Sequence, residues 1–207
     1  MREVTAWEAI VQADPNHSQW YIERFRTMAA QGHDLAGEAR MVDAMLPRGS
    51  RVLDAGCGTG RVGAELAARG HDVVGVDVDP RLIAAAREDH PGPDWRVGDL
   101  AELDLVGEGE ASFDAVVCAG NVLTFVAPGT EAEVLRRMGA HAGDGGRVAV
   151  GFGAGRGYTF DRFFADAGEA GLVLDLALST WDLRPFTAES DFLVAVLRPE
   201  SASAHQQ

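Results

Sequence analysis

The sequence predicts an α/β fold: a doubly wound, mostly parallel, seven-stranded sheet that ends in an antiparallel hairpin and is preceded by helices. Three observations indicate this fold. Short apolar segments alternate with amphipathic segments of helical length from residue 51 onward. A glycine-dense turn joins the first apolar segment to the first amphipathic one. The last two apolar segments have no helix-length segment between them, so we expect them to pair antiparallel.

The residues before the first strand are expected to be helical. Trp7, Ile10 and Val11 have the spacing of one helix face, and the sequence Asp-Pro-Asn at 14–16 interrupts that pattern. Two further helices are expected over 18–30 and 35–46. We therefore expect one domain, with a helical cap over 1–46 and an α/β core over 47–199.

The elements of the core follow from the same periodicity. The segment FDAVVCA is apolar almost throughout, which is typical of a strand buried on both faces, and Pro80 suits the first turn of a helix. Strands are expected over 51–54, 72–77, 95–97, 113–119, 147–152, 172–179 and 192–198. Helices are expected over 60–69, 80–89, 130–142 and 161–170, turns at 143–146 and 151–157, an acidic loop or broken helix over 98–112, and a disordered tail over 200–207.

Composition excludes several classes of function. The net charge of -14 argues against a nucleic-acid partner, because phosphate binding depends on clustered Lys and Arg. The N-terminus does not resemble a signal peptide, and no apolar run reaches the length of a membrane span, so we expect a cytoplasmic protein without a membrane partner. Cys57 and Cys118 form neither a disulfide framework nor a metal-spaced set, so no metal is expected.

The glycine-dense turn lies in the stretch RVLDAGCGTGRVG, residues 51–63. Gly56, Gly58 and Gly60 occupy every second position of the turn, so a ligand could lie directly against its backbone. The first N–H groups of the following helix would point at that ligand. In a doubly wound sheet the ligand crevice lies at the carboxyl ends of the strands, where the strand order reverses. We therefore expect the site beside this turn.

Two kinds of ligand fit the turn. Gly58, Gly60 and Gly63 match the GxGxxG pattern of dinucleotide sites, and Asp77 follows at about the ~20-residue distance that such sites use for the ribose acid. This match alone predicts an NAD(P)-dependent oxidoreductase. Three features argue against it. Asp54 and Ala55 intervene between the apolar part of the strand and the glycines, Asp99 adds a second acid on the same crevice edge, and the terminal hairpin is not typical of dehydrogenases.

Five segments in order resemble the motifs of the class I S-adenosylmethionine (SAM)-dependent methyltransferases, a Rossmann-like family, over residues 35–198. The segments are VLDAGCGTG, VVGVDVDP, RVGDLAEL, FDAVVCAGNVL and DGGRVAVGF. The resemblance implies SAM as cofactor, S-adenosylhomocysteine as product, and in-line transfer of a methyl group to a small molecule. A SAM-binding protein without catalytic activity is a further alternative, because the sequence identifies no general base.

The resemblance also implies which residues bind SAM. Asp54 and the glycine turn would hold the methionine end, Asp77 the ribose hydroxyls, and Asp99 the adenine amino group. Leu100 would contact the adenine ring, and the residues after the fourth strand would border the sulfonium. The full expected set is Asp54, Gly56, Cys57, Gly58, Gly60, Asp77, Val78, Asp99, Leu100, Ala119, Gly120 and Asn121.

Fewer residues are candidates for contact with the methyl acceptor. His17 and Tyr21 lie in the N-terminal segment that often forms a lid in this family, although an aromatic core is the structural alternative. Arg156 and Tyr158 belong to the second glycine-rich loop, and Trp181 belongs to the loop before the last strand. The segment AGNVL lacks the Asn/Asp-Pro-Pro-aromatic pattern of amino methyltransferases that act on nucleic-acid bases or glutamine. Nothing in the sequence indicates an oligomeric state.

Overall fold

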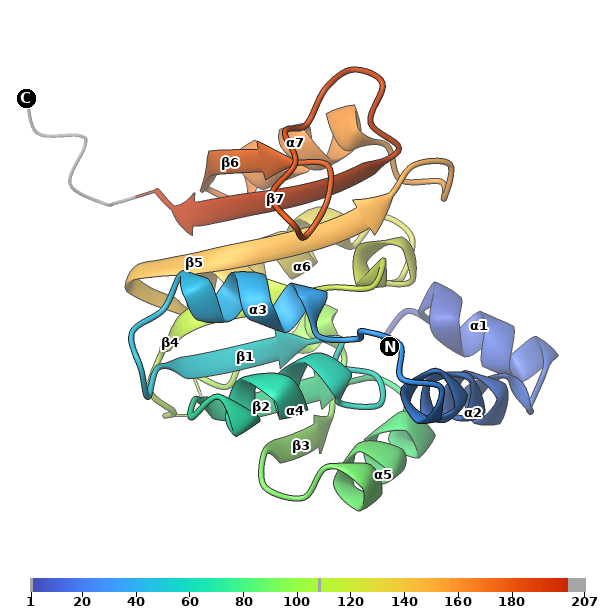
Figure 1. The fold of residues 1–207 in the computed structure, drawn as a ribbon. Coiled ribbons are helices and arrows are strands. Elements are labelled where there is room, and N and C mark those ends of the chain that lie inside the picture. Colours follow the sequence, from blue (N-terminus) through green and yellow to red (C-terminus); the bar gives the residue numbers. More distant parts are fainter. Residues whose placement is uncertain (1, 108, 201–207) are drawn as a thin grey trace, which may run out of the picture.

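The computed structural model describes residues 2–107 and 109–200. One seven-stranded sheet runs through them, with helices on both faces and two helices beyond its carboxyl edge (Figure 1). The strand order is β3-β2-β1-β4-β5-β7-β6. The first five strands pair in parallel, and β7 pairs antiparallel with both β5 and β6. The predicted fold class is confirmed.

Each strand and helix whose bounds were predicted begins and ends within two residues of the prediction, except β5. The strands are β1 Arg51–Ala55, β2 Asp72–Asp77, β3 Asp94–Val97, β4 Phe113–Cys118, β5 Ala142–Gly153, β6 Leu172–Leu178 and β7 Phe192–Pro199. The α-helices are α1 Ala6–Ala13, α2 His17–Ala30, α3 Gly37–Ala44, α4 Arg61–Ala68, α5 Pro80–Asp89, α6 Glu131–His141 and α7 Phe160–Glu169. Two short 3₁₀ helices, η1 Leu100–Glu102 and η2 Val122–Thr124, follow β3 and β4.

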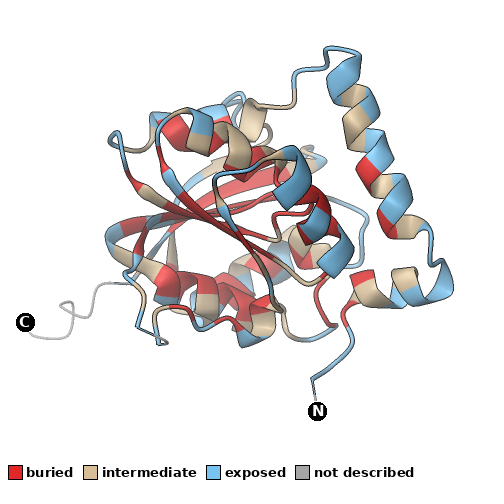
Figure 2. Ribbon diagram, turned by 90° about the horizontal axis from the view of Figure 1, so that it is seen from below, coloured by how far each residue is buried: buried red, intermediate tan, exposed pale blue. Residues whose placement is uncertain are grey.

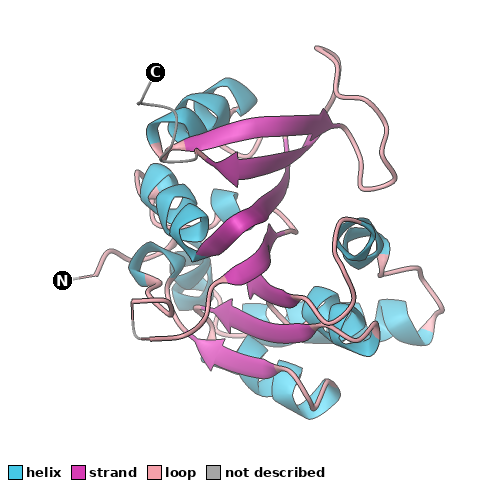
Figure 3. Cartoon of the chain, turned by 90° about the vertical axis from the view of Figure 1, so that its left-hand side faces the viewer, coloured by secondary structure: helices cyan, strands magenta, loops and turns pink. Residues whose placement is uncertain are grey.

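Helices cover both faces of the sheet (Figures 1 and 3), and a separate apolar layer lies beneath them on each face. On one face, Ala39 and Val42 of α3 and Leu66 of α4 pack on β1, β2 and β4. On the other, Leu135 of α6 and Phe163 of α7 join a larger cluster that includes both antiparallel strands. The burial colours in Figure 2 show the buried residues concentrated along the strands and on the inward sides of these helices. This two-sided burial explains the continuous apolar runs of the central strands.

The start of β5 corrects one prediction. Residues 143–146 were expected to form a turn, but they belong to β5, whose register on β4 shifts there. A Cβ atom at Gly146 would lie 2.9 Å from the carbonyl oxygen of Phe113, so glycine allows the two chains to approach closely. The expected loop over 151–157 also begins later, because β5 continues to Gly153 on β7. Of the tail expected to be disordered, residues 201–207 lie outside the described part of the chain.

Trp95 of β3 explains part of the GxGxxG match. Its buried indole occupies the space that side chains at three glycines would need. A Cβ atom would lie 2.9 Å from the ring at Gly60 and 2.8 Å from it at Gly63, and one at Gly75 would overlap the ring. The indole nitrogen donates to the carbonyl of His90 at 2.9 Å. Gly60 and Gly63 are therefore required to pack a tryptophan, independently of any ligand.

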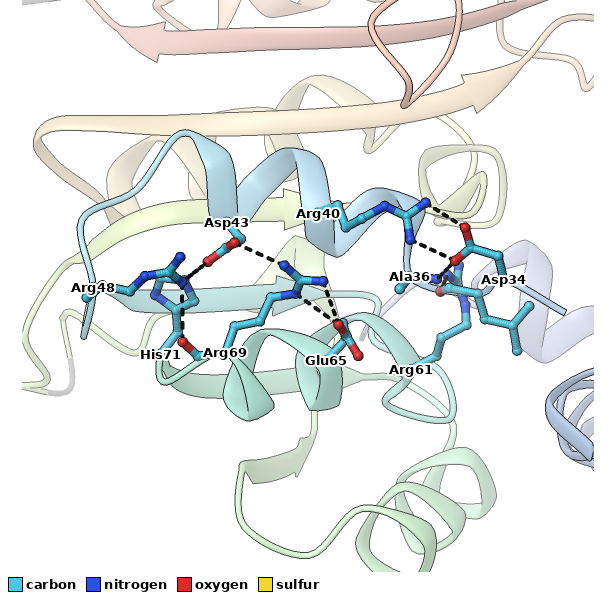
Figure 4. A network of polar contacts seen from close by, with 10 residues as sticks. Asp34, Ala36, Arg40, Asp43, Arg48, Arg61, Glu65, Arg69 and His71 are labelled. Atoms are coloured by element: carbon cyan, nitrogen blue, oxygen red, sulfur yellow. Dashed lines mark hydrogen bonds and ion pairs between the residues drawn. The ribbon is translucent and has the colours of Figure 1, made fainter. Parts of the chain in front are cut away.

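Polar contacts of Asp43 hold α3 against the turn between α4 and β2 (Figure 4). Asp43 of α3 accepts from His71 Nε2 at 3.0 Å and from Arg69 at 3.1 Å, and it also pairs with Arg48. At the other end of α3, Arg61 donates to Glu38 at 2.6 and 2.8 Å. Because Arg61 is the first residue of α4, this contact connects the glycine turn to the chain that leads from the N-terminal helices. In the described part of the chain, no helix combines the length and apolar character that crossing a bilayer requires.

Candidate active site

The glycine turn joins β1 to α4 at the carboxyl edge of the sheet. Gly56, Gly58 and Gly60 all have positive φ, at 79°, 55° and 81°, a conformation that other residues adopt at a cost. A Cβ atom at Gly56 would overlap Val122, and one at Gly60 would meet Trp95. Only Gly58 has room for a Cβ atom, 3.6 Å from the ring of Tyr21. Two of the three glycines are thus needed for packing as well as conformation.

Asp77 ends β2 beside this turn. One of its carboxylate oxygens accepts from the backbone N–H of Gly58 at 2.9 Å, and the other accepts from that of Asp79 at 2.9 Å. Burial raises the pKa of Asp77 to about 6 despite these two bonds. A ligand that donates further hydrogen bonds to this carboxylate would therefore stabilise its ionised form.

Asp54 is the next-to-last residue of β1 and is only 2% exposed. Its carboxylate accepts from the backbone N–H of Gly63 at 2.8 Å. Burial raises the pKa of Asp54 to about 7, with the neighbouring charge of Asp77 adding to the shift. Together with Gly56, Cys57 and Arg61, Asp54 lines a small recess of about 30 Å³ beside the turn.

The raised pKa of Asp54 predicts a loss of stability with increasing pH. Asp54 has a pKa of about 7 in the folded protein and of ~3.9 in the unfolded chain. Between these values the folded state holds a proton that the unfolded state has released, so the free energy of unfolding should fall as pH rises. We expect Asp54→Asn to remove roughly 2–3 kcal/mol of this fall between pH 5 and pH 7.5, since the amide does not ionise. Urea unfolding at pH 5 and pH 7.5 measures it.

Asp34→Asn is the matched control for that experiment. Arg40 holds the pKa of Asp34 at about 2, so Asp34 is ionised throughout this pH range in both states. The Asp34 variant should retain the wild-type dependence on pH. An identical dependence in Asp54→Asn and wild type would contradict the assignment.

Asp99 follows β3 and is covered by the N-terminus. Its side chain accepts from the backbone N–H of Ala101 at 2.9 Å and from Arg2 at 2.7 Å. Arg2 also pairs with Glu8 at the start of α1. The segment before α1 therefore crosses the edge of the sheet beside β3.

The helices α1 and α2 are attached over the same edge. Trp7 Nε1 and Ser18 Oγ both donate to Asp79, at 2.8 and 2.5 Å. The backbone N–H of Trp7 donates to the carbonyl of Phe125 after β4 at 3.1 Å. The Trp7 ring makes edge contacts with His17, Tyr21 and Phe125. This cluster covers the carboxyl edge between β2 and β4.

Trp7→Phe tests the attachment of these helices. The substitution retains ring packing but removes one of two side-chain donors to the buried Asp79 carboxylate, so we expect the free energy of unfolding to fall by about 1–2 kcal/mol. Trp20→Phe, on the 54%-exposed ring of α2, should change it by less than about 0.5 kcal/mol. Urea denaturation compares them, and equal losses would contradict the role of the Trp7 indole nitrogen.

A cavity of about 430 Å³ lies between the helices and the sheet edge, within the size range of ligand sites. It brings together most of the residues predicted from the sequence. Those that line it are His17, Tyr21, Gly56, Gly58, Asp77, Val78, Asp99, Leu100, Ala119, Gly120, Asn121 and Arg156. Asp54 and Cys57 line the adjoining recess, whereas Gly60 lines neither space, and a Cβ atom there would meet Trp95 and Ala86.

Tyr158 and Trp181 lie elsewhere. The buried Tyr158 hydroxyl donates to Asp166 at 2.9 Å, and its ring packs against Phe152. The Trp181 ring packs over Gly151 and beside Met41. Neither residue is among those that line the cavity in the described part of the chain.

Several lining residues were not predicted as site residues. They are Thr5, Trp7, Ile10, Trp20, Arg24, Phe25, Arg61, Leu82, Gly98, Val122, Phe125 and Val126. Trp7 and Trp20 carried a usable signal, because aromatic residues recur through the segment expected to form a cap. Phe125 and Val126 carried none, since only the folded chain brings them against α1.

Comparison with known proteins identifies the family. A family model described as a methyltransferase domain matches residues 52–146. The crystal structure of a TehB-like SAM-dependent methyltransferase from Corynebacterium glutamicum is 47% identical, with a TM-score of 0.85, over 90% of this chain and 100% of that one. The chain belongs to the class I SAM-dependent methyltransferases. SAM is accordingly its cofactor.

Curated relatives of this methyltransferase support the same family. Magnesium-protoporphyrin O-methyltransferase of Rhodobacter capsulatus is 36% identical over 59% of this chain and 53% of its own. A ubiquinone biosynthesis O-methyltransferase of Xanthomonas oryzae is 32% identical over 51% of this chain and 50% of its own. The chain spans about half the length of these curated relatives. The oxidoreductase and the non-catalytic alternatives gain no support from these matches.

Proposed function

We propose that the protein transfers the methyl group of SAM to a small-molecule acceptor held in the cavity between the sheet edge and α1–α2. One observation carries the proposal: the same cavity is lined by the strand-end acids Asp77 and Asp99 and by aromatic residues of both helices. The acids suit the cofactor, and the opposite wall remains for a second molecule. The small-molecule acceptor is also supported by the names of the two curated relatives and by the net charge of -14.

The chemistry of the cavity fits SAM. The backbone hydrogen bonds to Asp77 do not offset the cost of burying its ionised carboxylate. We therefore expect this carboxylate to accept hydrogen bonds from the ribose hydroxyls. Asp54, buried in the adjoining recess, would face the ammonium group. Asp99 and Leu100 would meet the adenine, with Asp99 sharing its carboxylate between adenine and Arg2. Gly58, where an added Cβ atom would make only ordinary contact with Tyr21, would let the methionine end approach the backbone of the turn.

The chain's contribution to the reaction is alignment and exclusion of water. SAM supplies an electrophilic methyl group on a sulfonium, which is already an activated leaving group. The orientation of the Asn121 side chain is fixed, because its Oδ1 accepts a hydrogen bond from the backbone N–H of Gly153 at 2.8 Å. Trp7 and Tyr21 cover the cavity from the side of the helices. Holding the acceptor in line under this cover supplies much of the rate in such a displacement.

The test is a pair of measurements on the full chain. Isothermal titration with SAM, S-adenosylhomocysteine and NADH should give binding of the two adenosyl sulfur compounds and none of NADH. Transfer of label from methyl-labelled SAM into a metabolite extract should give a labelled small molecule. Binding of NADH alone would contradict the proposal, and SAM binding with no transfer to any extract would favour a regulatory role.

A further inference from the structure

We propose that the acceptor is a small molecule with an apolar, ring-sized body and one anionic group, and that Arg24 and Arg156 bind that group. The proposal rests on the function proposed above and specifies its substrate class. The two arginines come from α2 and from the loop after β5, which approach the carboxyl edge of the sheet from different sides (Figure 1). Both line the cavity.

The distribution of ion pairs singles out these two arginines. All 18 basic residues of the chain are arginines, against 32 acidic residues. Among the described residues, only Arg24, Arg147 and Arg156 have no carboxylate or carbonyl oxygen within bonding distance. In so acidic a chain a guanidinium without such a partner is unusual, and two of the three line one cavity.

Arg156 lies at the end of the cavity beyond β4 and β5. A Cβ atom at Gly153 would be 3.6 Å from Arg156 Nε and 3.6 Å from Asn121 Oδ1, so both side chains flank the same backbone position. Asn121 is the residue for which we expect a place near the transferred methyl group. An anionic group bound by Arg156 would therefore lie within a small molecule's length of the reacting atom.

Arg24 is held in place by aromatic rings. Its guanidinium carbon lies 5.7 Å from the ring centroids of both Trp20 and Phe25, within cation–π range. Arg24 is one helical turn after Tyr21, whose ring covers Gly58. These contacts position the guanidinium at the cavity without neutralising it, so its charge remains for a ligand.

The charged residues that line the cavity fall into two sets, two acids and four basic residues. Its carboxylates are Asp77 and Asp99, at the ends of β2 and β3, and both are committed to SAM in the proposed function. The basic lining residues are His17, Arg24, Arg61 and Arg156, and Arg61 is already paired with Glu38. The charged lining groups assigned neither to SAM nor to an ion pair are therefore the guanidinium groups of Arg24 and Arg156, in a protein whose net charge is -14.

The rest of the lining defines the body of the acceptor. Five aromatic side chains face the cavity: Trp7, Trp20, Tyr21, Phe25 and Phe125. Aromatic walls bind flat apolar groups with little loss of side-chain freedom. A guanidinium binds a carboxylate through two parallel hydrogen bonds, which suits an aromatic acid. The combination favours a ring that carries a carboxylate over a neutral or cationic acceptor.

Benzoate and benzamide form a pair of probes that differ mainly in charge. We expect the full chain, saturated with S-adenosylhomocysteine, to bind benzoate at least about tenfold more tightly than benzamide in isothermal titration. Arg24→Gln and Arg156→Gln should each reduce that preference several-fold, and together abolish it. Arg147→Gln is the matched control, because Arg147 also has no such partner among the described residues but lies on β5 away from the cavity.

The outcomes separate this inference from the function it rests on. Equal binding of the two probes, no binding of either, or a preference that survives the double variant would overturn the anionic acceptor. Phenyl phosphate in the same titration distinguishes the two anions: tighter binding than benzoate would assign a phosphate as the anionic group. If wild type fails to bind S-adenosylhomocysteine, the proposed function itself fails. Unchanged affinity of the arginine variants for that compound shows that only the acceptor side was altered.

Discussion

Gly56→Ala is expected to lower the free energy of unfolding by about 2–5 kcal/mol and to abolish SAM binding at ordinary concentrations. Gly56 has a φ of 79°, which costs an alanine about 1–2 kcal/mol. Its new methyl group would also overlap the side chain of Val122, and overpacking of this kind costs about 1–3 kcal/mol. Both Gly56 and Val122 line the cavity, so any relief of the overlap must move its wall.

Gly58→Ala and a second-site change separate the two causes. Gly58 also has positive φ, at 55°, but its Cβ atom would stand 3.6 Å from Tyr21, in ordinary contact. Gly58→Ala should therefore show the conformational cost alone. Adding Val122→Ala to Gly56→Ala should recover part of the stability, because it removes the overlapping methyl groups. Urea denaturation gives the free energy of unfolding of the wild type, the two glycine variants and the double variant. Equal losses of this free energy in Gly56→Ala and Gly58→Ala would refute the packing role of Gly56.

Asp77→Ala is expected to weaken SAM binding by about 1–3 kcal/mol, or roughly 5- to 150-fold in Kd, with little change in the fold. The substitution removes the acceptor of the Gly58 N–H group and the one we assign to the ribose hydroxyls. Asp77→Asn keeps the shape and one acceptor oxygen, so its loss should be smaller. Isothermal titration gives the dissociation constants, and an unchanged value in Asp77→Ala would show that the residue only orders the turn.

The pH dependence of SAM binding provides a second test of the role proposed for Asp77. Its pKa is raised to about 6 by burial, and hydroxyl donors from a ligand would favour the ionised form and lower that pKa in the complex. Wild-type affinity should therefore increase as pH rises from 5 to about 7.5. Asp77→Asn should lose this component, since the amide does not titrate. A variant with the wild-type profile would assign the dependence to another group, such as Asp54.

Much of the cavity wall at the strand ends was predictable from sequence. Strand ends, a glycine turn and acids at fixed distances are local patterns, and parallel strands place their carboxyl ends at one edge. Asp77 and Asp99 therefore meet the cavity as expected. The opposite wall of the cavity was harder to predict, because it is built from α1, α2 and the loops after β4 and β5, whose positions depend on contacts between distant segments. Arg24 carried no local signal that distinguished it from a solvated helix residue.

The sequence by itself determined the α/β class, the terminal hairpin and the family, because each depends on periodicity or on motifs within short windows. Only the tertiary structure decided that β7 lies between β5 and β6, that Trp95 fills the space above Gly60 and Gly63, and that Arg24 and Arg156 face one cavity. The physical reason is range. The periodicity of a sequence shows which face of a helix or strand is buried. The residues that pack against that face come from distant segments of the chain, which meet only on folding.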